Sequence, residues 1–240
     1  MFTIEKAEWD TDYFGVLCAK AELLRVLSEQ EFCSFNEEVN KFQFVMVSNP
    51  DIYAENNKFL EKLSGSQKAD TNILLRSDAP FADSKKLPDG IELSISDNVE
   101  HGDIEEKVRG AFSASRFHHD PHISVDQADG IYINWLRNAQ LKENKYFCIC
   151  KVDGEFAGLI LFRKESSDTS LIELIFRCMD FRKAGVGSAM MHHLFEFCLK
   201  NDITKILVGT QERNETALKY FRKHGFKDVQ RTHIFHIWKS

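Results

Sequence analysis

The residues whose types and spacing could do chemistry lie in one stretch of the C-terminal half. An apolar run, 171–176, is followed by a break, then by Arg182, Lys183, Gly185 and Gly187, and then by an amphipathic helical pattern. Two glycines at i and i+2 let a backbone approach a ligand closely. The first N–H groups of a helix lack intrahelical partners, and with the positive end of the helix dipole they suit a phosphate. The stretch therefore predicts a strand and a loop that holds a pyrophosphate at a helix start.

Three families of anion-binding loops compete for this interpretation. The dinucleotide fingerprint requires Gly-x-Gly-x-x-Gly, but Met190 stands at its last position, and the Gly-Lys-Ser/Thr of the Walker loop is absent. The pattern Arg182-x-x-Gly185-x-Gly187 instead resembles the GCN5-related N-acetyltransferase (GNAT) family. A second signature of that family is matched farther along the chain by Asn214, Ala217, Phe221, Gly225 and Phe226.

The resemblance implies the fold class α/β (α+β), with a mixed central sheet flanked by helices. Residues 91–240 are expected to form the GNAT acetyltransferase domain, and residues 1–90 an extra N-terminal α/β subdomain. The charged stretch 77–90, with two prolines and a glycine, indicates a linker. The alternating tail, 232–238, is expected to close the sheet as a strand.

Two short sequence patterns each predict one local structure. Ser28 followed by Glu31 predicts a capped helix start for a helix that runs to about residue 41. Asp153-Gly154 between two apolar runs predicts a hairpin turn.

The resemblance also assigns residues to acetyl-CoA, the expected acyl donor. The strand backbone at Ile175, Phe176 and Arg177 would pair with the pantetheine arm, and Asn214 would contact that arm. Phe221 belongs to the same coenzyme-binding set. The loop that would hold the pyrophosphate consists of Arg182, Lys183, Ala184, Gly185, Val186, Gly187 and Ser188.

In this family an amine attacks the thioester directly, with no covalent enzyme intermediate. The amine must lose a proton, and Glu173 is the carboxylate nearest in sequence, although an outward-facing strand residue is an equal alternative. The leaving thiolate usually receives a proton from a tyrosine seven residues after the asparagine. Phe221 stands at that position, so the neighbouring Tyr220 is the candidate acid, with solvent or another residue as the alternative.

Two further tracts resemble the acetyltransferases that act on dTDP-4-amino-4,6-dideoxygalactose (dTDP-fucosamine). One is Trp9 to Gly15, which could equally be a loop packed by its own aromatics. The other contains Arg116 and Phe117, the candidate acceptor-binding residues, with Arg163 a weaker candidate. The implied acceptor is the 4-amino group of a dTDP-4-amino-6-deoxy sugar. An acetyltransferase for a protein N-terminus or a small amine, and a non-catalytic acetyl-CoA-binding module, are the alternatives.

The amino-acid composition argues against several other classes of function. The net charge of −6 argues against a nucleic-acid partner, and there is no apolar run of the roughly 20 residues that a transmembrane helix needs. The six scattered cysteines form no Cys-x-x-Cys pair and suit a reducing cytoplasm. Three histidines within 118–122 lack a carboxylate or cysteine set at ligand spacing, so no metal site is expected. The oligomeric state is left open, with a homodimer as one option.

Overall fold

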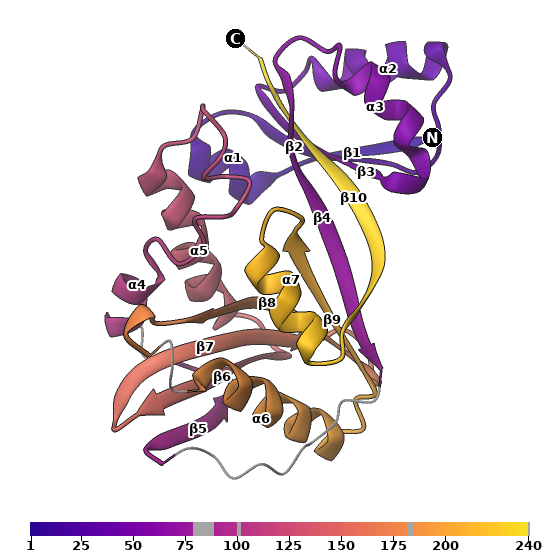
Figure 1. The fold of residues 1–240 in the computed structure, drawn as a ribbon. Coiled ribbons are helices and arrows are strands. Elements are labelled where there is room, and N and C mark those ends of the chain that lie inside the picture. Colours follow the sequence, from indigo (N-terminus) through magenta and orange to yellow (C-terminus); the bar gives the residue numbers. More distant parts are fainter. Residues whose placement is uncertain (79–88, 100–101, 182–184, 240) are drawn as a thin grey trace. The chain divides into compact units, whose positions relative to one another are not determined.

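The computed structural model describes residues 1–78, 89–99, 102–181 and 185–239 (Figure 1). The chain forms two compact units, each of which is described by itself. The first comprises Met1–Ile73, Gln211–Arg213 and Val229–Ser240, and the second comprises Leu74–Thr210 and Asn214–Asp228.

This division differs from the expected one at residue 90. The tail strand β10 (Lys227–Trp238) pairs antiparallel with β3 (Phe44–Pro50), so most of it belongs to the first unit. Strand β4 (Ser66–Asp78) includes the first two residues of the predicted linker, and residues 79–88 lie outside the described part of the chain. Alternation along a strand shows which side chains share a face, but it does not identify the pairing partner.

The first unit is built on strands with helices packed against them. Strands β1 (Phe2–Lys6), β2 (Cys18–Leu23), β3, β10 and β4 follow one another in that order. The helical segments are α1 (Glu8–Phe14), α2 (Glu29–Val39), the 3₁₀ helix η1 (Asp51–Asn56) and α3 (Asn57–Leu60). Side chains from the strands and from α2 and α3 share one core, which includes Leu23, Phe35, Val47, Leu60 and Phe235.

The start of α2 confirms the predicted cap. The Ser28 hydroxyl accepts a hydrogen bond from the Glu31 backbone N–H, and the Glu31 carboxylate accepts one in return from the Ser28 backbone N–H. Each bond satisfies a donor that would otherwise lack a partner.

The second unit has a mixed sheet. Strands β5 (Ile91–Ser96), β6 (Lys145–Val152), β7 (Glu155–Lys164) and β8 (Thr169–Arg177) pair antiparallel in sequence order, and β9 (Lys205–Gln211) pairs parallel with β8. The predicted β6–β7 hairpin is confirmed. Its turn residues Asp153 and Gly154 have φ of 52° and 84°, the left-handed values that a tight hairpin turn of this twist requires.

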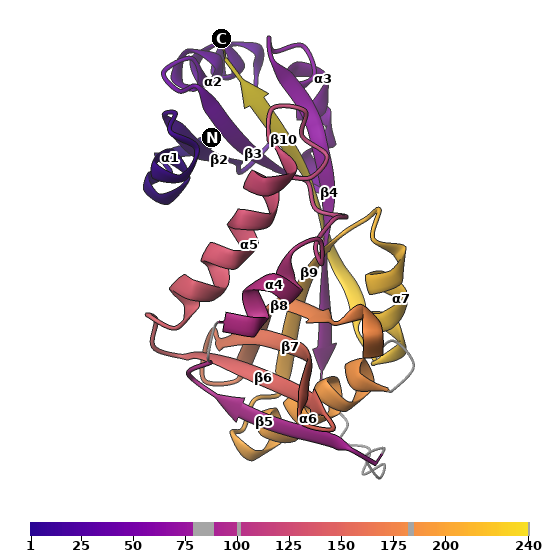
Figure 2. The ribbon, with the colours of Figure 1, turned by 90° about the vertical axis from the view of Figure 1, so that its left-hand side faces the viewer.

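Helices cover both faces of this sheet. They are α4 (Gly102–Val108), α5 (Val125–Ala139), α6 (Val186–Lys200) and α7 (Glu215–Lys223), with a 3₁₀ turn, η2 (Met179–Phe181), before α6. On one face, Phe162 of β7 contacts Phe197 of α6, with ring centroids 5.3 Å apart. On the other, Phe176 of β8 contacts Phe112, 5.9 Å away, in the segment before α5. Figure 2 shows α5 and α6 apart from each other, with strands of the sheet between them.

Of the described helices, none combines the length and the apolar character that a membrane span needs.

Candidate functional site

Strands β8 and β9 pair over only part of their length. The parallel register joins Thr169–Ile172 to Lys205–Val208, and β8 continues past it to Arg177. A strand end that extends beyond its neighbour can offer backbone N–H and C=O groups to an extended ligand, as an exposed sheet edge does. The three residues predicted to meet the pantetheine arm, Ile175, Phe176 and Arg177, lie in this extension.

A β-bulge interrupts the other edge of β8. Leu174 pairs with Leu161 and Ile172 pairs with Phe162, which leaves Glu173 as the extra residue. A bulge changes the face to which the following side chains point. Phe176 consequently contacts Phe112 on the α5 side, while Phe162 faces α6.

The start of α6 lies just after β8 and η2 in the chain. Gly185 precedes the helix with φ of 75°, a left-handed value that glycine adopts without strain. The first intrahelical bond runs from the Ala189 N–H to the Gly185 carbonyl, 3.0 Å apart. The N–H groups of Val186, Gly187 and Ser188 therefore have no acceptor within the helix, which is the arrangement that suits a phosphate.

The packing around Gly187 leaves little room for a side chain. A Cβ at this position would lie 3.2 Å from Cε2 of Tyr220, so the tyrosine ring lies against the helix start. Glycine at this position accommodates the tyrosine ring, and the N–H groups without an intrahelical acceptor suit the pyrophosphate expected from the sequence. Arg182, Lys183 and Ala184, predicted to belong to the same loop, lie outside the described residues.

Helix α7 brings Tyr220 to the start of α6. The Tyr220 hydroxyl donates a hydrogen bond to the Gly187 carbonyl oxygen, 2.6 Å away. Burial raises the pKa of this hydroxyl, so it carries its proton at neutral pH. Phe221, by contrast, is 1% exposed and packs against Phe226. Asn214 caps α7 by accepting a hydrogen bond from the Ala217 N–H, 3.1 Å away.

Glu173 has three polar partners. One carboxylate oxygen accepts from Lys145 at 2.7 Å and from the Trp135 indole at 3.2 Å, and the other accepts from Arg163 at 2.7 Å. The Glu173 side chain is only 3% exposed. Two cationic side chains thus pair with the carboxylate, one at each oxygen. These contacts favour a structural role over the predicted role as base, and they engage Arg163 as well.

Arg116 and Phe117 lie in the segment before α5. The Arg116 guanidinium carbon lies 4.3 Å from the centroid of the Phe117 ring, and the Arg116 Nε is buried with no hydrogen-bond partner in the described part of the chain. A buried N–H donor without an acceptor is costly. Phe117 is 4% exposed, which favours a packing role.

The aromatic tract of the first unit packs locally. Trp9 and Tyr13 stack with centroids 4.9 Å apart and planes at 8°. Between them in sequence, Asp10 is buried and accepts a hydrogen bond from Lys20 at 2.7 Å. The tract is packed by its own aromatics, as the alternative expected, but it forms helix α1 and not a loop.

Two of the three histidines in 118–122, His118 and His122, have different hydrogen-bond partners. His118 hydrogen-bonds to Ser115 and Asp129, whereas His122 contacts Asp120 at 3.2 Å. In the described ranges, no three histidine, cysteine or carboxylate side chains are grouped as a metal site would require. Sequence reasoning did not find the link to Asp129, because that residue lies 11 positions away on a different element and no motif connects them.

Comparison with known proteins decides the family. The profile of the acetyltransferase (GNAT) family matches residues 106–226, half of the chain. The chain belongs to this family. The matched range includes the extended β8, the start of α6 and helix α7.

Two relatives of this chain come from Bacillus subtilis. The spore coat polysaccharide biosynthesis protein SpsD is 26% identical over 197 residues, which cover 82% of this chain and 66% of SpsD. Streptothricin acetyltransferase A is 31% identical over 106 residues, which cover 44% of this chain and 59% of that protein. The chain thus spans about three-fifths to two-thirds of the length of these relatives.

Solved GNAT structures share the fold. A tandem GNAT protein from the clavulanic acid biosynthesis pathway superposes with a TM-score of 0.63 at 12% identity, covering 93% of this chain and 78% of that one. A GCN5-related N-acetyltransferase from Sphaerobacter thermophilus gives 0.62 at 11% identity, covering 99% and 76%. At these identities the likeness shows the fold alone, and it confirms the predicted fold class.

Proposed function

We propose that this chain is an acetyl-CoA-dependent N-acetyltransferase that acts by direct attack of an amine on the thioester. The observation that carries the proposal is the combination of an extended β8 with a helix start, α6, whose first N–H groups have no acceptor within the helix. The strand extension would hold the pantetheine arm by backbone hydrogen bonds. The α6 start would hold the pyrophosphate.

The chain's own residues would serve each step of this reaction. A backbone N–H of the β8 extension would stabilise the negative charge that develops on the thioester oxygen. Tyr220, protonated at neutral pH and located at the α6 start, would give its proton to the leaving thiolate. Cys178, which follows β8, is buried, and burial raises the pKa of its thiol. A thiol held protonated is a poor nucleophile, which supports direct attack.

The proposed acceptor is the 4-amino group of a dTDP-4-amino-6-deoxy sugar. Arg116 supports it, because its charged guanidinium has an Nε with no hydrogen-bond partner among the described residues, and a diphosphate would supply acceptors to that group. The relative SpsD, which is named for polysaccharide biosynthesis, agrees with an acceptor of the sugar class.

The test measures thiol release with acetyl-CoA and three acceptors side by side: the intact sugar nucleotide, the free amino sugar and a peptide amine. We expect preference for the sugar nucleotide. Arg116→Ala should raise its KM by about 10–150-fold, the equivalent of roughly 1.5–3 kcal/mol for a charge-assisted bond, and leave the KM for acetyl-CoA nearly unchanged. The matched control is Arg109→Ala, an exposed arginine in the same segment.

Other outcomes separate the alternatives. Equal rates with the free sugar, or preference for the peptide, would reject the sugar nucleotide and keep the acetyltransferase. A small basic amine is the second candidate, favoured by the 31% identity to streptothricin acetyltransferase A, and streptothricin is its probe. Coenzyme binding by calorimetry without thiol release from any amine would indicate a non-catalytic binding module.

A further inference from the structure

A serine, a histidine and an aspartate of the second unit form a hydrogen-bonded chain beside the acceptor-binding candidate Arg116. The Ser115 hydroxyl lies 2.9 Å from Nδ1 of His118, and Nε2 of His118 lies 3.0 Å from a carboxylate oxygen of Asp129 on α5. The same Asp129 oxygen accepts a hydrogen bond from the Gly110 N–H at 3.0 Å. Both ring nitrogens of His118 therefore have defined partners.

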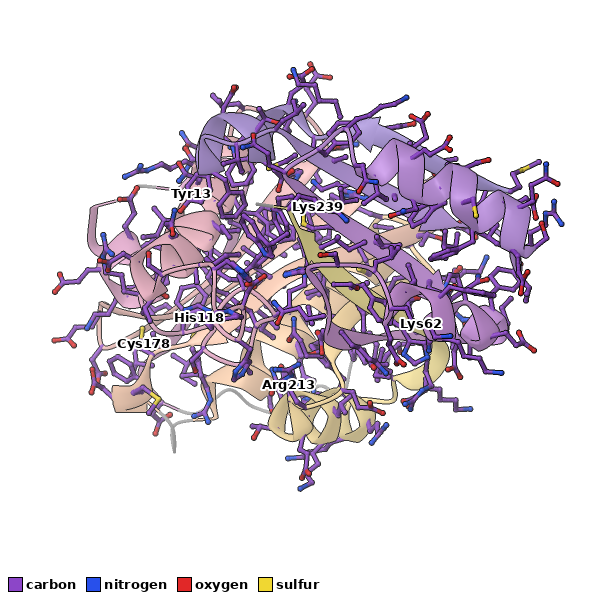
Figure 3. The ribbon with its side chains drawn as sticks, turned by 90° about the horizontal axis from the view of Figure 1, so that it is seen from above. Tyr13, Lys62, His118, Cys178, Arg213 and Lys239 are labelled. Atoms are coloured by element: carbon purple, nitrogen blue, oxygen red, sulfur yellow. The ribbon has the colours of Figure 1, made fainter. Side chains whose placement is uncertain are left out.

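The network is enclosed. The side chains of His118 and Asp129 are 7% and 9% exposed, and Ser115 is 2% exposed. The ring of His118 stacks on Tyr132 at 19°, with centroids 6.5 Å apart. His118, labelled in Figure 3, is packed on one ring face and bonded at both ring nitrogens. Such packing fixes the orientation of the imidazole.

Ring contacts connect this network to β8. Tyr132 stacks on Phe112 with centroids 4.3 Å apart, and Phe112 contacts Phe176 in the β8 extension. The network thus lies on the α5 side of the strand proposed to hold the pantetheine arm. That face also carries the segment with Arg116, the proposed contact of the acceptor.

The chemistry of the three groups suits proton uptake. In the neutral state, Nε2–H of His118 donates to the Asp129 carboxylate, and Nδ1 accepts from the Ser115 hydroxyl. The carboxylate then stabilises the imidazolium that forms when Nδ1 takes a proton. Asp129, Ser115 and Tyr132 contact the imidazole.

The reaction requires such an acceptor. An amine is protonated at neutral pH and must lose a proton before it attacks. Glu173, the carboxylate considered from the sequence, is engaged by Lys145, Arg163 and Trp135. Both of its carboxylate oxygens already accept hydrogen bonds from these side chains.

We infer that His118 removes the proton of the acceptor amine through the Ser115 hydroxyl, with Asp129 holding the imidazole; this inference rests on the proposed acetyltransferase function. Because Ser115 is buried, the ammonium gives one proton to a bridging water, which passes a proton on to the Ser115 oxygen. The Ser115 hydroxyl gives its own proton to Nδ1 of His118, and the neutral amine then attacks the thioester carbon. Imidazolium replaces ammonium, so charge and protons balance.

The test compares the pH dependence of kcat in the parent, His118→Gln and Asp129→Asn, with acetyl-CoA and dTDP-4-amino-4,6-dideoxygalactose both saturating. We expect His118→Gln to lower kcat at neutral pH by about 10²–10⁴-fold, the usual scale for a positioned base. The loss should shrink as the pH rises, because the free amine then loses its proton to solvent. Added imidazole should restore part of the rate, and acetyl-CoA affinity by calorimetry should not change.

Two further variants distinguish loss of the relay from an unspecific effect of the substitution or a failure to fold. His193→Gln replaces a histidine on α6, on the opposite face of the sheet, and should leave the pH profile unchanged. If His118→Gln does not fold, as judged by circular dichroism, Ser115→Ala interrupts the same relay.

Three results would overturn the inference. One is a parent pH profile retained in the folded variants, and another is a loss confined to the KM of the acceptor, which would indicate a purely structural network. Both leave the acetyltransferase proposal standing. A parent enzyme without turnover on any amine of the panel would remove the proposed function and the relay together.

Discussion

At the scale of single residues, Tyr220 is the proposed proton donor, and its side chain lies at the start of α6. Its hydroxyl lies 2.6 Å from the Gly187 carbonyl, and burial keeps it protonated. Phe221, which stands where the family usually has a tyrosine, is instead a core residue that is 1% exposed. The acid function would therefore have moved by one position along α7.

Tyr220→Phe tests this assignment. Removing the hydroxyl should lower kcat by roughly 10²–10⁴-fold, the scale for a positioned acid, and should change coenzyme affinity little because the ring remains. The control is Tyr146→Phe, whose ring packs against Phe162 and Phe197 on the α6 side of the sheet. Steady-state rates that stay within about threefold of the parent would exclude Tyr220 as the acid, since a positioned acid contributes far more.

At the scale of elements, helix α6 begins directly after the turn at Gly185. The positive φ at Gly185 turns the chain into the helix, and the N–H groups of Val186, Gly187 and Ser188 point along its axis without intrahelical acceptors. Such a helix start binds anions through oriented donors and the helix dipole.

Gly187→Glu should abolish acetyl-CoA binding measured by calorimetry. The substitution places bulk and negative charge where the pyrophosphate would lie. Gly187→Ala is the matched control. Its Cβ would sit 3.2 Å from the Tyr220 ring and requires a shift of only a few tenths of an ångström, so we expect a small effect. Coenzyme binding by the glutamate variant at the parent's affinity would show that the loop assignment is wrong.

At the scale of the whole molecule, two cysteines of the second unit are poorly suited to carry an acetyl intermediate. Burial raises the pKa of Cys178, the thiol that follows β8, and raises that of Cys150 in β6 to about 11. Both thiols stay protonated at neutral pH and are weak nucleophiles. This favours a ternary complex of coenzyme, acceptor and protein.

We therefore expect sequential kinetics, with intersecting double-reciprocal lines. Cys178→Ala should retain the parent kcat, and Cys33→Ala, which changes an exposed cysteine of α2, is its control. Parallel lines together with an acetylated Cys178 in the mass spectrum would instead establish covalent catalysis.

Elements with local signals could be predicted from the sequence. The Ser28–Glu31 capping box and the Asp153-Gly154 turn each depend on residues within four positions of one another, and both are confirmed. The apolar spacing that predicted α6 also needs only neighbouring turns. The family loop was found in the same way, from Arg182, Gly185 and Gly187.

The tertiary structure decided what depends on distant partners. Glu173 meets Lys145 and Trp135, which lie 28 and 38 positions away, because a bulge sets its direction. Strand β10 pairs with β3 and so joins the first unit. Strand register and side-chain contacts of this kind arise only when separate segments pack together, and no periodicity within either segment encodes them. The residue types show which chemical groups this chain has, and the packing shows which of these groups are already engaged by other side chains.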